Sequence, residues 1–406
     1  MSNRILIITQ WFDPEPTFKG LLFAKELVKR GHEVEVLTGF PNYPGGKIYP
    51  GYKIKLIQKE KIDGVSIVRL PLFPSHNNRK IGRIANYVSF AISVIFYGVF
   101  FVKKPNVIYS YHPPLTVGIA SVIIKFFRRT PIVYDIQDLW PDTLEATDMI
   151  NSKKLLKAIS WACDQIYKSV DKIVVLSPGF KLKLMERNIP STKLEVIYNW
   201  ADEEILRSHN AKLNFFKEEK NNFNILFAGN IGRAQKLEVV LEAAKILLND
   251  HPMIKFIFLG NGISLDALKK QSKKMQLSNI IFMNEVPMHQ VGIFLESADV
   301  LLIHLKKNKL FEITIPGKTQ AYMSIGKPII IGVKGDASDL INNAKCGITI
   351  ESENAEELAE AAISLANLSE EEMLRLGHNA RDFYDKNLSV KRGVDKFSYL
   401  FNKVIS

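Results

Sequence analysis

Glycines and basic residues gather in one segment of the second half of the chain, residues 229–236 (Gly-Asn-Ile-Gly-Arg-Ala-Gln-Lys). The segment follows an apolar run and leads into a pattern typical of a helix. Gly229 and Gly232 let backbone amides approach a phosphate at the positive end of that helix, and Arg233 or Lys236 adds a full charge. The spacing predicts a phosphate site, with a tight turn that carries solvated cations as the alternative.

Two more glycines, Gly260 and Gly262, follow the next apolar run, again at the carboxyl end of an expected strand. Neither glycine loop has the Gly-x-Gly-x-x-Gly spacing of dinucleotide sites. No acidic residue stands at the distance at which such sites contact a ribose. The pattern therefore argues against a nicotinamide-dependent dehydrogenase.

The segment from Leu310 to Pro328 holds the densest set of candidate side chains. A proline suits a first helical turn, so we expect a loop over residues 311–315 and a helix over 316–325. Glu312 precedes this helix, Gln320 lies one turn inside it, and Lys318 can reach an anion at its amino end. The segment predicts a second ligand-binding loop at the same edge of the sheet.

These loops require parallel strands that end at a common edge. Short apolar runs alternate with helical patterns such as residues 18–30 and 153–169, which is typical of parallel sheets covered on both faces. We expect strands at residues 4–9, 33–38, 65–70, 107–111, 131–134, 172–176, 195–197, 224–228, 255–259, 279–283, 300–304, 328–331 and 347–350. The fold class is therefore α/β.

The alternation lapses once, in a polar stretch, so the chain is expected to form two Rossmann-like domains. We expect an N-terminal domain over residues 1–200, a linker over 201–222 and a C-terminal domain over 223–386. A last helix within 387–406 is expected to return to the first domain. The carboxyl ends of both sheets are expected to face a central cleft, where ligands bind in folds of this kind.

The composition narrows the class of protein. A chain of 406 residues exceeds the usual single domain, and 47% hydrophobic and 24% charged residues are ordinary for a globular protein. The two cysteines, Cys163 and Cys346, show neither disulfide nor zinc spacing. A net charge of +12 points to anionic partners, but no nucleic-acid-binding motif is present. The amino-terminal residues read as a first strand, because a secretory signal needs a longer apolar region.

Residues 84–102 form an uncharged, aromatic stretch between basic residues, with Arg79, Lys80 and Arg83 before it and Lys103 and Lys104 after it. We expect a helix that is buried or inserted into the membrane surface, and a full membrane span is the alternative. A span would place the following strand on the far side of the membrane. The basic flanks suit docking on an anionic leaflet.

The segment around residue 312 resembles the E-x7-E element of the retaining GT-B glycosyltransferases grouped as family 4. Glu312 takes the first Glu position and Gln320 the second, and Tyr-Met-Ser-Ile-Gly-Lys-Pro at 322–328 resembles the family's "YMAxGKP". The resemblance covers essentially the whole chain. Further motifs, similar to those of bacterial surface-polysaccharide transferases, stand at residues 39–44, 111–114 and 138–141, and residues 313–322 are most similar to N-acetyl-L-fucosamine transferases of O-antigen and capsule assembly.

The resemblance implies roles for single residues. Glu312 is expected to hydrogen-bond hydroxyls of the donor sugar, and the backbone amides at Thr314 and Ile315 to hold the sugar and phosphate. The family's second Glu contacts ribose hydroxyls. Gln320 can still accept one hydrogen bond and donate another there, but it lacks the charge.

The sequence departs from the family at the diphosphate. Asn230 and Gln235 stand where the family usually has Arg and Lys, so we expect Arg233 and Lys318 to supply the positive charge. The usual Gly-Gly after the first strand is changed as well. Gly20 and the preceding lysine are the remaining candidates there.

Two residues of the first half complete the expected site. His112 corresponds to a family histidine beside the donor sugar; a strand-end histidine satisfied by backbone is the alternative. Asp138 is a candidate for orienting the acceptor hydroxyl, and a helix cap is the alternative. Both follow expected strands.

The resemblance implies an enzyme that transfers a sugar, with retention, from a UDP-sugar to a polyprenyl-diphosphate-linked acceptor in O-antigen, capsule or lipopolysaccharide synthesis. We expect a cytoplasmic protein peripherally associated with the inner face of the membrane, with no nucleic acid as partner. No cofactor or metal is expected, because no DxD pair is present. A UDP-N-acetylglucosamine 2-epimerase of the same fold and a non-catalytic membrane-associated scaffold are the alternatives.

Overall fold

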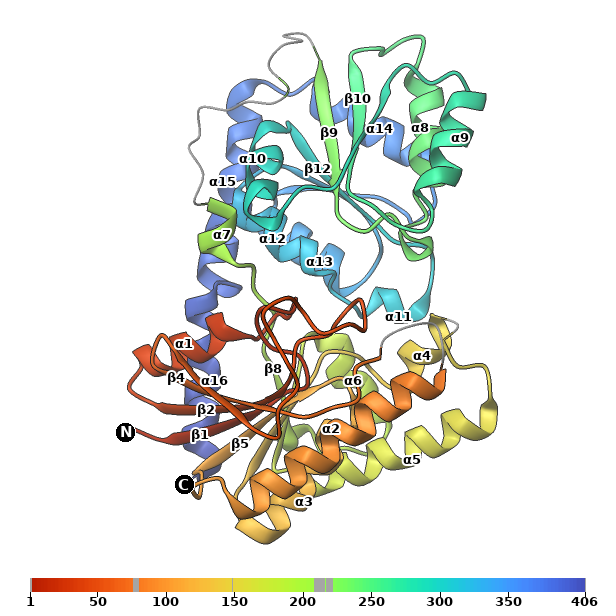
Figure 1. The fold of residues 1–406 in the computed structure, drawn as a ribbon. Coiled ribbons are helices and arrows are strands. Elements are labelled where there is room, and N and C mark those ends of the chain that lie inside the picture. The colour runs from red at the N-terminus through yellow and green to blue at the C-terminus, as the bar shows by residue number, and fades with distance from the viewer. Residues whose placement is uncertain (1, 76–79, 148, 208–215, 217–221, 406) are drawn as a thin grey trace. The chain divides into compact units, whose positions relative to one another are not determined.

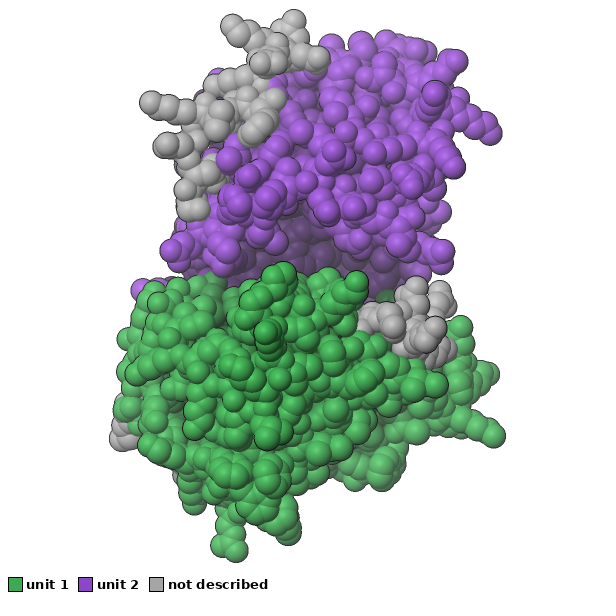
Figure 2. All heavy atoms as spheres, viewed as in Figure 1, with its two compact units in different colours: residues 1–198, 393–406 green, residues 199–392 purple. Residues whose placement is uncertain are grey.

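The computed structural model describes residues 2–75, 80–147, 149–207, 216 and 222–405 (Figure 1). The chain divides into two compact units, which Figure 2 shows in different colours. Unit 1 comprises residues 1–198 and 393–406, and unit 2 comprises residues 199–392. Each unit is an α/β structure in which helices pack against the unit's own sheet.

Unit 1 is built on an eight-stranded sheet in the order β3-β4-β2-β1-β5-β6-β7-β8. The chain order reverses between β1 and β5, which is where doubly wound sheets bind ligands. The strands are β1 Arg4–Ile8, β2 Glu33–Gly39, β3 Gln58–Ile62, β4 Val65–Leu70, β5 Val107–His112, β6 Ile132–Ile136, β7 Lys172–Val175 and β8 Leu194–Val196.

One strand of this sheet was not expected. β3 pairs antiparallel with β4 at the sheet edge, whereas every other pair in the sheet is parallel. Its sequence, Gln-Lys-Glu-Lys-Ile, has no apolar run. A charged edge strand of this kind resists pairing with other chains.

Helices cover both faces of the unit 1 sheet (Figure 1). They are α1 Leu21–Lys29, α2 Lys80–Phe100, α3 Leu115–Arg128, α4 Asp142–Ala146, α5 Lys153–Ser169, α6 Pro178–Glu186 and most of α16 Val390–Ile405, with a 3₁₀ turn η1 at Ser191–Lys193. α2, α3 and α5 lie side by side on one face, where α3 packs against both neighbours (Figure 1). Phe397 of α16 contacts Phe23 and Tyr109, so the last helix packs on the core of unit 1.

Among the described residues, one helical stretch, Ile81–Phe100 of α2, is long and apolar enough to cross a membrane. Only 33% of its most apolar part is buried, so the helix is neither a core helix nor fully exposed. Arg79, one of the flanking basic residues, lies outside the described residues.

Unit 2 has a six-stranded parallel sheet in the order β11-β10-β9-β12-β13-β14, which reverses between β9 and β12. The strands are β9 Phe223–Ala228, β10 Ile254–Leu259, β11 Ile280–Met283, β12 Val300–His304, β13 Ile329–Gly332 and β14 Gly347–Thr349. The helices are α7 Glu203–Arg207, η2 Arg233–Gln235, α8 Glu238–Leu247, α9 Leu265–Lys274, α10 Met288–Ser297, α11 Lys309–Glu312, α12 Gly317–Ile325, α13 Asp336–Ala344, α14 Ala355–Ala366 and α15 Glu370–Asn387.

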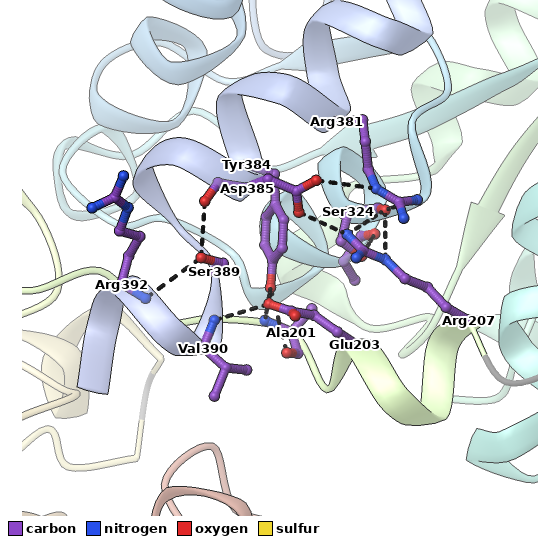
Figure 3. A network of polar contacts seen from close by, with 11 residues as sticks. Ala201, Glu203, Arg207, Ser324, Arg381, Tyr384, Asp385, Ser389, Val390 and Arg392 are labelled. Atoms are coloured by element: carbon purple, nitrogen blue, oxygen red, sulfur yellow. Dashed lines mark hydrogen bonds and ion pairs between the residues drawn. The ribbon is translucent and has the colours of Figure 1, made fainter. Parts of the chain in front are cut away.

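The predicted linker, residues 201–222, begins with a short helix, α7. Most of it, residues 208–215 and 217–221, lies outside the described residues. Its first part forms α7, whose Arg207 donates to the Ser324 carbonyl and pairs with Asp385, while Glu203 accepts from the Tyr384 hydroxyl at 2.8 Å (Figure 3). α7 is thereby tied to α12 and α15 within unit 2.

α15 supports the helix that the sequence marked as functional. Arg381 donates to the Ser324 carbonyl at the end of α12 at 2.9 Å (Figure 3). A Cβ atom at Gly377 would lie 2.2 Å from the Gly326 carbonyl oxygen, so the two backbones approach closely. The far end of α12 is therefore held in place, which also fixes the direction of its amino end.

Candidate functional site

The two glycine loops of unit 2 interlock at the carboxyl edge of the sheet. The Gly229 amide donates to the Leu259 carbonyl at 2.9 Å, and the Ile231 amide donates to the Asn261 carbonyl at 2.8 Å. Gly260 has a φ of +141°, and a Cβ atom there would lie 2.1 Å from the Gly229 carbonyl oxygen. Only glycine fits such a contact, so the loops after β9 and β10 form one continuous surface.

Tyr322 fixes α12 against the same edge. Its buried hydroxyl accepts from the Ala228 amide at 2.9 Å and donates to the Ala228 carbonyl at 3.2 Å. One side chain thereby satisfies both backbone groups at the end of β9. The amino end of α12 begins after Pro316, whose side chain provides no cap. This geometry holds a helix amino end, with its positive partial charge, beside the Gly229 loop.

Lys318 lies in the first turn of α12, and its ammonium group is buried. Within the described parts of the chain, Nζ has no hydrogen-bond partner. It lies 3.5 Å from the centroid of the Phe227 ring, and a Cβ atom built on Gly229 would be 3.5 Å from it. Burial lowers the pKa of Lys318 to about 7. An unpaired buried cation is costly, so this site is suited to an anion that enters beside Gly229.

Gly232 and Arg233 occupy the turn between β9 and α8. The Gly232 amide donates to Oε1 of Gln235 at 3.1 Å, so a side chain of the same turn already satisfies it. Arg233 starts η2 and is exposed. The structure therefore presents Arg233 to solvent near the glycine loop and does not lock it in place.

His304, at the end of β12, supports this turn from behind. Its Nδ1 donates to the Gln235 carbonyl at 2.7 Å, and its Nε2 accepts from the Glu353 amide at 3.0 Å. This pair of contacts requires the neutral ring, and burial lowers its pKa accordingly. Sequence reasoning did not assign His304 a role, because its two partners are distant in the chain.

Glu312 ends the short helix α11, where the sequence predicted a loop over residues 311–315. Asn308 caps this helix by accepting from the Leu310 amide at 2.8 Å. Gly335, with a φ of +87°, lies so close that a Cβ atom there would be 2.0 Å from the Glu312 carbonyl oxygen. The backbone of Glu312 is thus held by the loop after β13, and its side chain is half-buried.

Thr314 and Ile315 form the short connection from α11 to α12. The Thr314 hydroxyl donates to the Leu310 carbonyl at 2.7 Å, and the Thr314 amide donates to the Phe311 carbonyl at 3.3 Å. Ile315 is buried. The Thr314 amide is therefore already used inside the turn, in contrast to its expected role toward a ligand.

Gln320 is buried inside α12. With its amide nitrogen toward the start of the helix, it donates to the Pro316 carbonyl at 3.0 Å and the Gly317 carbonyl at 3.3 Å. A glutamate has no proton to donate there. The local hydrogen bonding explains why an amide suits this position in place of the family's carboxylate.

Gly20 in unit 1 makes room for a carboxylate of its own chain. A Cβ atom at Gly20 would lie 2.1 Å from Oδ2 of Asp13, and that oxygen accepts from the Leu21 amide at 2.6 Å. Asp13 thus occupies the amino end of α1. The neighbouring Lys19, a weaker candidate from sequence, is fully buried and its Nζ lies 2.6 Å from Oδ2 of Asp135. This ion pair makes Lys19 a structural residue.

His112 ends β5 in a fully buried position. Neither ring nitrogen has a hydrogen-bond partner in the described part of the chain, and burial lowers its pKa to about 3. The Trp140 ring packs edge-on at 5.1 Å between centroids. The alternative expected from the sequence, a histidine whose ring is hydrogen-bonded to backbone groups, is therefore not observed among the described residues. A neutral imidazole with two unused polar atoms is available to a ligand.

Asp138 follows β6, and desolvation raises its pKa to about 6. Burial raises the pKa values of Tyr43 and Tyr111, and the negative charge of Asp138 raises both further. The backbone carbonyl of Asp138 accepts from the Trp140 amide at 3.1 Å. His112 and Asp138 therefore share the carboxyl edge of the unit 1 sheet, with Trp140 beside the histidine ring.

Glu15, to which sequence reasoning assigned no role in the site, is a buried carboxylate in the loop after β1. It accepts from the amides of Asn42 and Tyr43, each at 2.7 Å, and of Phe12 at 3.2 Å. Burial raises the pKa of Glu15 to about 7. Across the described ranges, no group of three or more His, Cys, Asp or Glu side chains is arranged to hold a metal ion.

The two units match two protein families in sequence. Residues 21–200 match the family described as glycosyl transferase 4-like domain, and residues 210–383 match the family described as glycosyl transferases group 1. Together the matches span most of both units.

Individual proteins are similar over most of their length. The putative colanic acid biosynthesis glycosyl transferase WcaI of Escherichia coli is 25% identical over 81% of this chain and 83% of its own. The probable glycosyltransferase WbjE of Pseudomonas aeruginosa is 24% identical over 75% of this chain and 76% of its own. The crystal structure of Anabaena HepE in complex with UDP-glucose superposes with a TM-score of 0.71 at 14% identity, covering 99% of this chain and 100% of HepE.

Proposed function

Because this chain is a glycosyltransferase of the GT-B type, we propose that it transfers a sugar from a UDP-sugar to a polyprenyl-diphosphate-linked acceptor in bacterial surface polysaccharide synthesis. The transfer proceeds with retention, and N-acetyl-L-fucosamine is the sugar that the sequence motifs favour. The name of WcaI, a putative colanic acid biosynthesis glycosyl transferase, supports the polysaccharide, and the HepE complex supports the uridine nucleotide.

One observation carries this proposal: the buried ammonium of Lys318 lacks a hydrogen-bond partner among the described residues and lies beside Gly229. Departure of a nucleoside diphosphate builds negative charge, and a fixed cation in a dry site stabilises it strongly. The amino end of α12 adds backbone amides with the same sign of potential. The exposed Arg233, in the same turn, adds a second positive charge.

The sugar donor is held by neighbouring groups of unit 2. Glu312 binds hydroxyls of the transferred sugar, with the Ile315 amide toward the phosphate. Gln320 serves the nucleotide through its carbonyl oxygen, because its amide nitrogen is engaged by the helix start. Gly229 keeps a side chain out of the space beside the Lys318 ammonium, and Gly260 lets the loop after β10 pack against the backbone of Gly229.

Unit 1 supplies two groups for the reacting atoms. His112 stays neutral at every physiological pH because its pKa is about 3, so it donates or accepts a hydrogen bond without adding charge. Asp138 is ionised above a pH of about 6 and orients the acceptor hydroxyl. Gly20 has no direct role toward the donor in this scheme, because the Asp13 carboxylate occupies the space beside it.

The exposed side of α2 supports the proposed association with a membrane. Apolar side chains recur on it at helical spacing, and Ile92 and Phe96 are 61% and 59% exposed. Further exposed members are Ile81, Ile84, Val88 and Phe100. Arg83 precedes most of this stripe, and the exposed Lys103 and Lys104 follow it. This pattern suits a helix that lies in an anionic leaflet at the inner face of the cytoplasmic membrane.

A panel of UDP-sugars incubated with a short polyprenyl-diphosphate-GlcNAc acceptor tests the proposal, with the product followed by mass. We expect the acceptor to gain one sugar residue. A parallel incubation with UDP-GlcNAc and no acceptor must leave the sugar unchanged, because conversion there identifies an epimerase. Absence of transfer and of donor hydrolysis across the panel would identify a non-catalytic scaffold.

A further inference from the structure

Three aromatic rings meet at the carboxyl edge of the unit 1 sheet. Trp11 follows β1, Tyr43 lies in the loop after β2, and Tyr87 lies on α2. The centroids of Trp11 and Tyr43 are 4.7 Å apart, and those of Trp11 and Tyr87 are 6.4 Å apart. All three side chains are half-buried, unlike Tyr109 and Tyr134 of the same sheet, which are fully buried. The cluster therefore leaves part of its aromatic surface facing outward.

A buried carboxylate holds the loop that carries Tyr43. Glu15 accepts from the amides of Asn42 and Tyr43, and the Tyr49 hydroxyl donates to the Tyr43 carbonyl at 2.6 Å. Burying a carboxylate is unfavourable unless it is hydrogen-bonded, and here backbone amides provide those bonds. The Glu15 carboxylate thus fixes the backbone of the loop that carries the Tyr43 ring.

Three buried amide side chains link the segments that carry the other two rings. Gln10, which precedes Trp11, donates to Asn86, which precedes Tyr87. Asn86 in turn donates to Oδ1 of Asn42 at 3.1 Å and to the Phe73 carbonyl at 2.7 Å. A connected buried network of this kind fixes one arrangement of its segments. These buried hydrogen bonds therefore hold the three segments that carry the rings in fixed positions relative to one another.

A carboxylate lies at the same edge of the sheet as the cluster. Asp138 follows β6 and Trp11 follows β1, and one strand, β5, lies between these two strands. One face of a pyranose ring is lined by C–H bonds with partial positive charge, and the faces of aromatic rings are negative. The hydroxyls at the rim of the same sugar need polar partners, which Asp138 provides. An aromatic surface beside a carboxylate is thus complementary to a sugar.

We propose that Trp11, Tyr43 and Tyr87 form the subsite that binds the sugar of the acceptor, with the hydroxyl to be glycosylated directed toward Asp138. This subsite rests on the proposed function, since it assumes a sugar acceptor. Tyr87 lies on the same helix, α2, as the exposed apolar stripe. A lipid-linked sugar bound beside Tyr87 meets the protein close to the helix proposed to contact the membrane.

Saturation-transfer NMR with GlcNAc α-1-phosphate, a lipid-free probe, tests the subsite directly. We expect transfer to the ring protons of the sugar with the wild type, and its loss with Tyr87→Ala. Tyr399→Ala removes a tyrosine that is 70% exposed on α16 and serves as the matched control. Equal signals from both variants would overturn the proposal, as would a wild type that gives no signal.

Kinetics with the short polyprenyl-diphosphate-GlcNAc acceptor provide the second readout. Tyr87→Ala and Trp11→Ala are expected to raise the acceptor KM about 10-fold while the UDP-sugar KM stays within about 2-fold. Tyr87→Phe is expected to restore the acceptor KM, which separates stacking from misfolding. Equal effects on both KM values would contradict the subsite. A wild type that transfers no sugar contradicts the proposed function itself, whereas UDP binding measured alone is independent of this subsite.

Discussion

Replacing Lys318 with methionine removes the buried ammonium group and keeps a side chain of similar length. Burial lowers the Lys318 pKa from 10.5 to about 7. This shift means that the buried charge destabilises the folded protein by at most about 5 kcal/mol. Attraction to the Phe227 ring, 3.5 Å away, offsets about 1–2 kcal/mol of this cost. We therefore expect Lys318→Met to raise the free energy of unfolding by about 2–4 kcal/mol at pH 7.

The stability gain has a defined pH dependence. The unfolded chain carries a lysine with an ordinary pKa of 10.5, so the charge costs nothing above that pH. The cost grows as the pH falls from 10.5 to about 7 and stays constant below 7. Urea denaturation at pH 6, 8 and 9.5 measures it. The difference between variant and wild type should be largest at pH 6 and smallest at pH 9.5.

The same substitution is expected to weaken UDP binding about 10- to 100-fold, because it removes a charge-assisted contact with the diphosphate. Isothermal titration calorimetry at pH 7 measures this effect. Lys309→Met, which removes an exposed lysine from the preceding helix α11, should change neither stability nor UDP affinity appreciably. A Lys318→Met protein that is less stable than the wild type and binds UDP equally well would refute the assignment of an anion site.

Three other variants give separate tests. Glu312→Gln should lower the transfer rate about 100-fold with UDP affinity nearly unchanged, because only the sugar contact weakens; stopped assays and calorimetry distinguish the two. Gln320→Glu should reduce the free energy of unfolding by about 1–3 kcal/mol, since a carboxylate cannot donate to the carbonyls at the helix start; an unaltered urea midpoint would contradict this. Ile92→Asp with Phe96→Asp should weaken binding to phosphatidylglycerol vesicles about 100-fold in sedimentation assays, whereas Tyr399→Asp should not.

The sequence predicted the fold well where strands are buried on both faces. β5 and β12 consist of continuous buried residues, so their apolar runs stand out. β3 was not predicted, because its side chains are half-buried or exposed and give no apolar run. It is a strand only through its pairing with β4. The α/β fold class with two parallel-sheet units is confirmed, apart from this antiparallel edge. The cleft expected between the two halves stays a prediction.

The candidate site was less accessible to sequence reasoning, because its contacts join distant residues. Lys19 was a candidate site residue beside Gly20, but its partner, Asp135, lies 116 residues away in the chain. Glu15 and Asn42 similarly meet only once β1 and β2 are paired. Lys318 was placed correctly near a helix start, whereas its stacking on Phe227 depends on how α12 packs against β9.

Hydrogen–deuterium exchange with and without UDP tests the donor site most directly. At a UDP concentration near the wild-type Kd, UDP is predicted to protect the backbone amides of residues 229–236, 260–262 and 317–319 in the wild type, and to protect them much less in Lys318→Met, whose UDP affinity is expected to be lower. Protection confined to unit 1, or equal protection in wild type and variant, would contradict the central claim that the buried lysine and the glycine loops bind the diphosphate.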